Sequence, residues 1–429
     1  MRIYLDSIGC RLNQSEIETF ARQFCAVGHV LVSDPSDADL AVINTCTVTS
    51  AAAADSRKKI RGMSRAGVPE VVVTGCWSTM EPENASKLIN VIRNVNNAEK
   101  DNLVPLILDK PPEMFDTAPL VRTPIPGSRL KTRAFIKVQD GCDNRCTFCI
   151  TTIARGSGKS LSIGLVLREI QAALDGGAKE IVLTGVHMGS WGNDFQKPNS
   201  FTALVKTILK DTDIPRLRLS SLEPWDIDEG FFDLWSDNRL ARHLHLPLQS
   251  GSAKILYRMA RKITPEVYAD LLVAAREAIP GVAITTDVIV GFPGETDDEF
   301  SESLTFVEEM KFARGHVFTY SERPGTTAAR MSGTVPHPLR KNRNALMRKA
   351  LEKSEGKYQT DFLGHKVVAL WETANRTHSE EWSLTGLSDN YLRISAKSPE
   401  NRWNQFDHVK LNGIKGKTII GQILENYES

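Results

Sequence analysis

Three cysteines of one short loop have the spacing that points most directly to chemistry. Cys142, Cys146 and Cys149 stand four and three residues apart, with Gly141 before them and polar residues between them. Thiolates at this spacing do not share one face of a regular helix or strand, but a tight loop can wrap them around a compact inorganic centre. Zinc normally takes four ligands, and no second cysteine pair lies nearby. A 4Fe-4S cluster held by three cysteines, with one iron open, is therefore favoured over a zinc knuckle or an inert turn.

A second set of three cysteines, Cys10, Cys46 and Cys76, is spread over the first part of the chain. Each follows a short apolar run typical of a buried parallel strand. The runs are Ile3–Leu5, Leu40–Ile43 and Val71–Val73, and predicted helices over Glu16–Val27 and Ala51–Met63 lie between them. The carboxyl ends of parallel strands meet at one edge of an open sheet. We therefore expect these three thiols to converge on a shared metal site, with three separately buried cysteines as the alternative.

The composition of the 429 residues is that of an ordinary globular protein, with a net charge of +1. The N-terminus is charged from Arg2 onward and carries no hydrophobic signal region, and no apolar run has transmembrane length. These features predict a cytoplasmic protein without a membrane partner, in which thiols stay reduced. Cysteines in such a protein indicate metal binding or catalysis rather than disulfides. The seventh cysteine, Cys25, is expected to be a core residue of the first helix.

Alternating strands and helices follow the first domain and predict a curved, parallel, partial (β/α)6 barrel. The expected strands are Ala134–Val138, Glu180–Thr184, Arg216–Ser220, His243–Leu248, Ala283–Val290 and His316–Tyr320. The expected helices are Ile163–Leu174, Phe201–Leu209, Asp228–Trp235, Pro265–Ala278 and Asp297–Met310. Chemistry in such a barrel belongs at the carboxyl ends of the strands. Mostly polar or glycine residues there form a candidate lining for a nucleoside and an amino acid, together with Val186: Gly185, Ser221, Glu223, Gln249, Ser250, Asp287 and Gly291.

The last part of the chain changes from a basic helical stretch, Leu339–Phe362, to short β-like runs after Gly364. These runs predict a small antiparallel β-barrel, and its basic residues are interleaved with aromatic ones. Such a mixture suits looped RNA by charge and stacking, although a place in the core is favoured for any individual aromatic residue. The aromatic residues are Trp371, Trp382, Tyr391, Trp403 and Phe406. We therefore predict three domains, 1–130, 131–362 and 363–429, with a proline-rich linker over Val104–Gly127.

The two cysteine sets, in this order, resemble those of the radical S-adenosylmethionine (SAM) methylthiotransferases. Further matching segments are Gly9–Gln14, Ile43–Thr49, Thr74–Cys76, Ala154–Gly156, His243–Ser252 and Asp287–Thr296. Thr132–Phe135 and Val317–Ser321 resemble the branch of that family that acts on N6-threonylcarbamoyladenosine beside the tRNA anticodon. The resemblance implies an α/β fold with an open N-terminal sheet, a radical SAM barrel and a TRAM-like RNA-binding barrel. It also implies a transferase that adds a methylthio group to C2 of that adenosine.

The resemblance further implies which residues hold cofactors. Cys142, Cys146 and Cys149 would bind the 4Fe-4S cluster that binds SAM, with Phe148 beside it. The first set, Cys10, Cys46 and Cys76, would hold a second 4Fe-4S cluster where sulfur is bound and methylated by a second SAM. Partners would be the tRNA anticodon stem-loop and an unidentified electron donor and sulfur source. An isopentenyladenosine in tRNA and a ribosomal-protein aspartate are alternative substrates, and a zinc-containing RNA-binding protein is the non-enzymatic alternative.

Overall fold

The computed structural model describes residues 1–115, 132–377 and 380–424, and within them the chain forms two compact units. The first unit comprises Met1–Gly177, Leu183–Asn199 and Ser321–Ala329. The second comprises Ala178–Val182, Ser200–Tyr320 and Arg330–Ser429. The predicted boundary at 130/131 and the later part of the predicted linker lie outside the described residues. No helix of the described part is long and apolar enough to cross a membrane.

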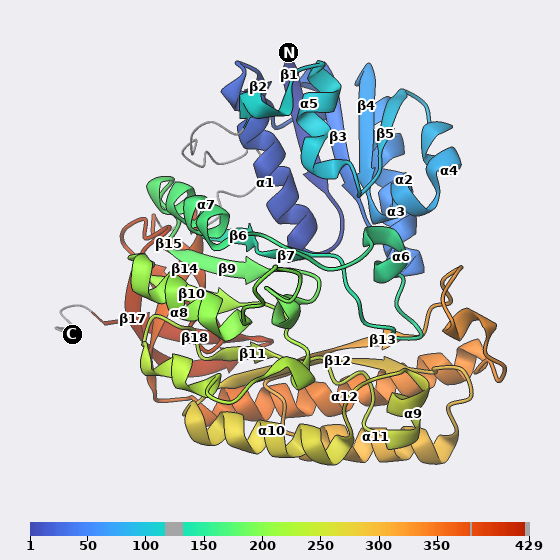
Figure 1. The fold of residues 1–429 in the computed structure, drawn as a ribbon. Coiled ribbons are helices and arrows are strands. Elements are labelled where there is room, and N and C mark those ends of the chain that lie inside the picture. The colour runs from blue at the N-terminus through green and yellow to red at the C-terminus, as the bar shows by residue number, and fades with distance from the viewer. Residues whose placement is uncertain (116–131, 378–379, 425–429) are drawn as a thin grey trace. The chain divides into compact units, whose positions relative to one another are not determined.

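The N-terminal part of the first unit is an open five-stranded sheet of order β2-β1-β3-β4-β5, as predicted from its apolar runs (Figure 1). Its neighbouring strands pair in parallel. The strands are β1 Arg2–Ser7, β2 Val30–Leu31, β3 Leu40–Thr45, β4 Glu70–Gly75 and β5 Val91–Val95. The helices are α1 Arg11–Ala26, α2 Ser50–Arg65, α3 Cys76–Met80, α4 Pro82–Ser86 and α5 Leu103–Leu108. Helices cover both faces of this sheet, so the valines and isoleucines of its central strands are buried, which is typical of parallel sheets.

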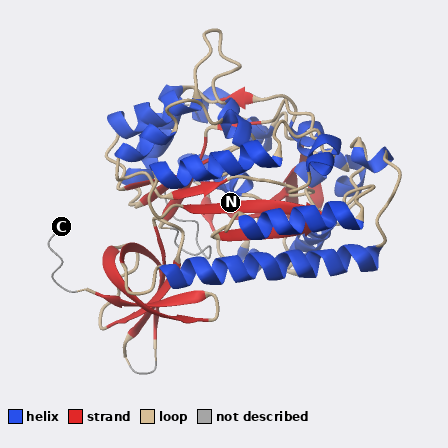
Figure 2. Cartoon of the chain, turned by 90° about the horizontal axis from the view of Figure 1, so that it is seen from below, coloured by secondary structure: helices blue, strands red, loops and turns tan. Residues whose placement is uncertain are grey.

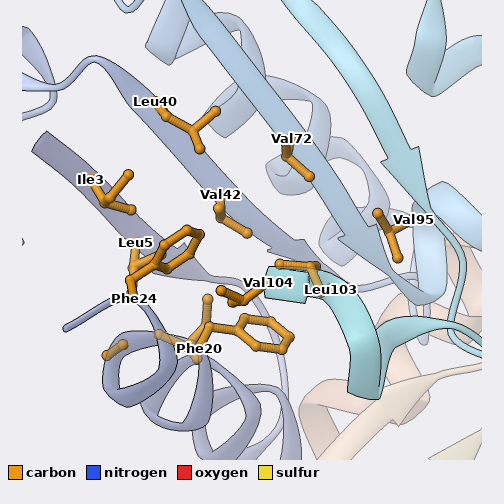
Figure 3. Close-up of a cluster of buried hydrophobic side chains, with 12 residues drawn as sticks. Ile3, Leu5, Phe20, Phe24, Leu40, Val42, Val72, Val95, Leu103 and Val104 are labelled. Carbon is orange, nitrogen blue, oxygen red and sulfur yellow. The ribbon is translucent and has the colours of Figure 1, made fainter. Parts of the chain in front are cut away.

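Two hydrophobic clusters cover the two faces of this sheet. Helix α1 packs Phe20 and Phe24 against Ile3, Leu40 and Val42 on one face, together with α5 (Figure 3). The other face packs α2, α3 and α4 against a second set of strand residues. This set comprises Ala41, Ile43, Val71 and Val73. Side chains alternate across each strand, so a sheet with helices on both faces must bury consecutive residues in opposite clusters.

Three expectations for this part are wrong. Helix α1 begins at Arg11 rather than Glu16, so its first turn directly follows Cys10. Cys25 is exposed, because Phe24 and Ala21 take the inward positions of the helix. The first residues of the predicted linker form α5, whose apolar side chains pack on the sheet, instead of an irregular segment.

The central part contains two three-stranded sheets, of order β10-β9-β6 and β11-β12-β13. Their strands are β6 Arg133–Lys137, β9 Glu180–Thr184, β10 Arg216–Leu219, β11 His243–His245, β12 Ala283–Val290 and β13 Arg314–Thr319. The helices are α6 Thr151–Arg155, α7 Ile163–Asp175, α8 Phe201–Asp211, α9 Ala253–Arg258, α10 Pro265–Ala278 and α11 Asp297–Glu309. The predicted helix Asp228–Trp235 is only a 3-10 turn over Phe232–Ser236, because Gly230 before it has φ +81°. Residues Lys159–Ser160 form β8, paired with β7 Gln139–Asp140.

A long helix, α12 His337–Asp361, leads to a closed five-stranded barrel, whose strands appear in red beside the C-terminus in Figure 2. The strands are β14 Lys366–Arg376, β15 Trp382–Ser388, β16 Arg393–Ser398, β17 Phe406–Lys415 and β18 Thr418–Ile423. The barrel is not entirely antiparallel as predicted, because β18 inserts between β17 and β16 and pairs with β16 in parallel. This arrangement closes the sheet and leaves no free edge strand.

Three of the aromatic residues in this part of the chain make contacts inside the protein. Trp371 is fully buried in the barrel core, and its Nε1 donates to Asp407 at 2.6 Å. Tyr391 stacks on His243 with ring centroids 4.0 Å apart, and the guanidinium of Arg216 lies 4.6 Å from the Phe406 ring centroid. The burial of Trp371 agrees with the core position that the sequence favours for an individual aromatic residue of this barrel.

Candidate functional site

The three N-terminal cysteines lie beyond the carboxyl ends of β1, β3 and β4. Cys46 directly follows β3, Cys76 directly follows β4, and Cys10 precedes the first turn of α1. Cys46 and Cys76 are buried, whereas Cys10 is exposed. Gly9 has φ +103°, and a Cβ built there would lie 2.7 Å from Cys46 Sγ. Only glycine permits this approach, which brings the loop of Cys10 against Cys46.

Two asparagines tie the ends of these strands together. Asn13 donates through Nδ2 to the carbonyl oxygens of Ile8, at 2.7 Å, and Thr45, at 3.0 Å. Asn44 donates to the Asn13 carbonyl at 3.1 Å and to Glu16 Oε2 at 2.8 Å. Because Ile8 and Thr45 stand just before Cys10 and Cys46, these bonds fix the backbone that carries two of the three thiols. The buried asparagines are therefore part of the support of the site.

A buried ion cluster lies behind this support. Lys100 Nζ donates to Glu16 Oε2 at 2.7 Å, and Arg155 Nη1 donates to Glu16 Oε1 at 3.0 Å. All three side chains are about 2% exposed. Burial raises the pKa of Glu16, but Lys100 and Arg155 lower it more, so this pKa lies far below its usual range. Glu16 is therefore ionised, and the loss of either cation would leave a buried charge without full compensation.

Arg155 also holds the loop of the second cysteine set. Its Nη1 donates to both carboxylate oxygens of Asp140, at 2.8 and 3.0 Å, and its Nη2 donates to Asn13 Oδ1 at 2.7 Å. Asp140 in turn accepts from the backbone N–H of Gly141, directly before Cys142. One guanidinium thus connects the first turn after Cys10 with the start of the Cys142 loop.

The loop itself closes on the turn after α6. Gly141 has φ +67°, and a Cβ there would lie 1.9 Å from the carbonyl oxygen of Ser157, so no other residue fits. Cys142 N donates to the Gly156 carbonyl at 3.0 Å. The N–H of Asn144 donates to Cys142 Sγ, and the N–H of Thr151 donates to Cys149 Sγ, each at 3.4 Å. Hydrogen bonds to sulfur are among the interactions that tune iron–sulfur clusters.

A second link joins the two cysteine sets. Asn97 Nδ2 donates to the Ala154 carbonyl at 2.7 Å and lies 3.7 Å from Cys76 Sγ. Ala154 and Arg155 both belong to α6, the short helix that begins two residues after Cys149. Both cysteine sets therefore lie in the first compact unit and share one buried polar scaffold.

The N-terminal thiols would ligate a metal only in their deprotonated form. The pKa of Cys46 is raised to about 11, chiefly by burial; the Val48 backbone N–H lowers it, Cys10 and Cys76 raise it, and Arg155 lowers it. A thiol with this pKa is protonated at neutral pH unless a cation binds it, and thiolates are the ligating form. Within the described residues, no three His, Cys, Asp or Glu side chains form a site for a single metal ion. Three thiols are a donor set that a 4Fe-4S cubane can take, because each thiolate of such a cluster binds a different iron.

Some of the predicted SAM contacts lie at partly exposed strand ends. Glu223 is held by buried Arg261, whose Nη2 donates to Oε2 at 2.7 Å. Asp287 Oδ2 lies 3.4 Å from His245 Nε2, and Gln249, with φ +72°, donates its backbone N–H to the Asp287 carbonyl. Ser221 forms a bridge with His245 in the same unit. Ser221, Glu223 and Gln249 thus follow β10 and β11, whereas Asp287 lies within β12 rather than at its end.

The remaining predicted contacts are divided between the loop region and the wall of the barrel. Phe148 is half-buried, and Val186 N donates to Gln139 Oε1 next to Gly185. Ser250 is fully buried and lies 3.5 Å from Ser303 of α11. A Cβ at Gly291 would meet Arg340 Cγ at 2.2 Å. Ser250 and Gly291 are thus packing positions here and present no exposed group to a ligand.

Comparisons with known proteins decide the family. Residues 136–307 match the Radical SAM superfamily, and residues 2–96 match a family described as Uncharacterized protein family UPF0004. The Threonylcarbamoyladenosine tRNA methylthiotransferase MtaB of Bacillus subtilis is 34% identical over 94% of this chain and 92% of its own. The protein of the same name from Thermotoga maritima is 32% identical over 97% and 96%. The chain belongs to the radical SAM methylthiotransferase family.

Solved structures support the fold of this methylthiotransferase. The radical SAM methyltransferase TsrM from Kitasatospora setae aligns with a TM-score of 0.57 at 15% identity, over 76% of each chain. The cobalamin-dependent radical SAM enzyme OxsB aligns with a TM-score of 0.51 at 14% identity, over 82% of this chain and 56% of its own. The predicted fold class, with its open parallel sheet, radical SAM barrel and closed C-terminal barrel, is confirmed. As a family member, the protein is a transferase, and its family implies SAM and a 4Fe-4S cluster.

Sequence reasoning missed most of the scaffold of the methylthiotransferase site. Asn13, Glu16, Asn97 and Lys100 are polar residues of the kind that usually lie on a surface, and their partners are distant in sequence. One signal of this scaffold was present in the sequence. The first turns of α1 carry polar residues at positions where a helix that packs on a core normally carries hydrophobic side chains.

Proposed function

We propose that this methylthiotransferase converts N6-threonylcarbamoyladenosine beside the tRNA anticodon to its 2-methylthio derivative. The observation that carries the proposal is the presence of two cysteine sets on one scaffold, in a chain whose MtaB relatives are 32–34% identical. Relatives named tRNA-2-methylthio-N(6)-dimethylallyladenosine synthase are 27–29% identical. The difference in identity favours the threonylcarbamoyl substrate, and the other nucleoside and a ribosomal-protein aspartate remain the alternatives.

The cysteines are assigned as cluster ligands. Cys142, Cys146 and Cys149 would hold the SAM-binding cluster, and Cys10, Cys46 and Cys76 would hold the second one. The bound cofactors supply the radical chemistry needed to functionalise C2 of adenine, whose unactivated C–H bond acid–base groups alone do not cleave. The protein's own contribution is to hold two sites at fixed positions, through Arg155, Asn97 and the buried Glu16.

The residues proposed to bind SAM are those at the strand ends with an accessible polar group or backbone. Arg261 fixes the Glu223 carboxylate and His245 lies beside Asp287, so both acceptors are held in one orientation before a ligand arrives. Such pre-orientation reduces the entropy lost on binding. The remaining proposed contacts are Phe148, Gly185, Val186, Ser221 and Gln249. We also propose the division into domains 1–130, 131–362 and 363–429, the last of them TRAM-like and RNA-binding.

Comparison of tRNA nucleosides from cells with and without the gene tests the proposed substrate. We expect loss of the 2-methylthio derivative of threonylcarbamoyladenosine, accumulation of the unmethylthiolated nucleoside, and no change in the isopentenyl derivatives. Loss of the methylthio-isopentenyl nucleoside instead would assign the other tRNA substrate. Unchanged tRNA together with an altered ribosomal-protein aspartate would assign the third.

Iron content tests the proposal of two clusters. After anaerobic reconstitution we expect about eight irons per chain and a brown protein, because each cysteine set would hold one 4Fe-4S cluster. Substitution of Cys10, Cys46 and Cys76 by alanine should reduce the content to about four. Saturation of the fully active wild type at about four irons would contradict the second cluster. A colourless protein containing zinc would instead support the non-enzymatic alternative.

A groove on the C-terminal barrel is the candidate contact for tRNA. It has a volume of about 440 Å³ and a partly apolar lining, to which hydroxyl, amide and basic side chains also contribute. They include Ser383, Ser395, Lys397, Ser398, Arg402 and Gln422. Lys397→Ala should weaken tRNA binding and reduce the salt dependence of the affinity by about one unit of slope, because one phosphate contact is lost. Exposed Lys210 on α8 provides the control Lys210→Ala, and equal affinities of both variants at several salt concentrations would exclude this groove.

A further inference from the structure

Arg323 is a buried charge without a carboxylate partner among the described residues. It follows β13 within the segment of the first unit that comprises Ser321–Ala329, and it is 8% exposed. Its Nη2 donates to Ser50 Oγ at 2.6 Å and to Ser321 Oγ at 3.0 Å, but its Nε has no hydrogen-bond partner. A buried guanidinium bonded only to hydroxyl groups is unfavourable unless an anion lies nearby.

The position of Arg323 makes the need for a nearby anion stronger. Ser50 is the first residue of α2, and Thr49 caps that helix. The positive end of the helix dipole lies at this terminus, where a cation is destabilised and an anion is stabilised. The local structure therefore provides two positive charges, one partial and one full, without a negative side chain bonded to either.

The hydrogen bond to Ser50 holds the Arg323 guanidinium at the loop that connects Cys46 with α2. Cys46 stands four residues before Ser50. Burial lowers the pKa of Arg323, whereas the negative charges of Cys46 and then of Glu81 raise it. Glu81 makes no ion pair with Arg323, and its Oε2 accepts from Asn84 at 3.0 Å. Arg155, by contrast, is compensated by Glu16 and Asp140. Arg323 is therefore a cation whose charge is available to the thiolates.

We propose that Arg323 acts as a charge partner of the cluster at Cys10, Cys46 and Cys76, and raises its reduction potential. The inference rests on the second cluster of the proposed function. A cubane with three thiolate ligands carries net negative charge, and one-electron reduction adds one more. A fixed cation in a low-dielectric site therefore stabilises the reduced state more than the oxidised state. Arg323 is thus a positioning and tuning residue rather than a cluster ligand.

The test isolates this cluster in the full chain by replacing Cys142, Cys146 and Cys149 with alanine. Potentiometric titration with dithionite, followed by electron paramagnetic resonance, then gives the potential of the remaining cluster. Arg323→Gln keeps the ability to donate to Ser50 and removes the charge, so we expect a shift to more negative potential. Arg323→Lys restores the charge and should restore most of the wild-type potential.

Arg22→Gln is the matched control for loss of a largely buried arginine. Arg22 pairs with Glu169 and lies on α1, twelve residues beyond Cys10. That separation is about 18 Å along the helix, and Glu169 neutralises the charge of Arg22, so we expect no shift.

The outcomes separate this inference from the function on which it rests. If the background variant with intact Arg323 binds no iron, the proposed second cluster is wrong, and the role of Arg323 with it. If it binds about four irons and Arg323→Gln leaves the potential unchanged, only the role of Arg323 is wrong. Weaker tRNA binding at an unchanged potential would overturn the inference in favour of an RNA phosphate contact.

Discussion

Cys46→Ala should abolish methylthiolation of tRNA and leave the reductive cleavage of SAM intact, whereas Cys146→Ala should abolish both. The reason is that Cys46 belongs to the set proposed to carry sulfur, and Cys146 to the set proposed to bind SAM. Alanine at position 46 keeps the backbone bonds that fix this segment, since Ser56 Oγ accepts from Cys46 N and donates to Cys46 O, each at 3.0 Å. The loss is therefore expected to be chemical rather than structural.

The two variants are best compared in one anaerobic assay of iron content, 5′-deoxyadenosine yield and modified nucleoside. Exposed Cys25 provides the matched control, and Cys25→Ala should leave all three measurements unchanged. Detectable methylthiolation by Cys46→Ala would contradict the division of roles. So would failure of that variant to cleave SAM while its Cys142–Cys149 cluster is intact. The second failure would mean that the shared scaffold makes each cluster dependent on the other.

Glu180→Gln should cause the largest loss of stability, about 3–5 kcal/mol of unfolding free energy, because two buried arginines would lose their carboxylate. Arg218 donates to Glu180 Oε1 at 2.8 Å and to Oε2 at 3.1 Å, and Arg216 donates to Oε2 at 3.5 Å. All three side chains are nearly or fully inaccessible to solvent. The same arginines donate to backbone carbonyls of the C-terminal barrel: Val368, Leu387, Ser388 and Asp389.

Urea denaturation followed by circular dichroism measures this change. Glu352→Gln is the control, because its ion pair with Lys417 is largely exposed and should contribute only about 0–1 kcal/mol. A change below about 1 kcal/mol for Glu180→Gln would contradict a stabilising role of the buried pairs. The contacts also mean that removal of residues 364–429 would expose two arginines, so point substitutions test RNA binding by the barrel more cleanly than truncation.

The amino-acid sequence determined the helices and strands, and the edge of the N-terminal sheet at which the candidate site lies. Valine- and isoleucine-rich runs form buried parallel strands wherever helices cover both faces, and β9 and β12 end at the predicted residues. Residues after the carboxyl ends of parallel strands meet at one edge, so the positions of Cys46 and Cys76 followed from local pattern alone. The barrel strands followed from the same patterns, except β15, which holds no continuous apolar run.

Only the tertiary structure decided which polar residues support that site. Glu16 and Arg155 are 139 residues apart, and Arg323 and Ser50 are 273 apart, so no local pattern connects them. A charged side chain in sequence is normally solvated, and only packing reveals that it is buried and must have a partner. The same holds for Cys25 and Trp371, whose exposure and burial depend on which face of a helix or barrel meets the core. Periodicity places a residue on an element, whereas the partner of that residue is fixed by contacts between distant segments of the chain.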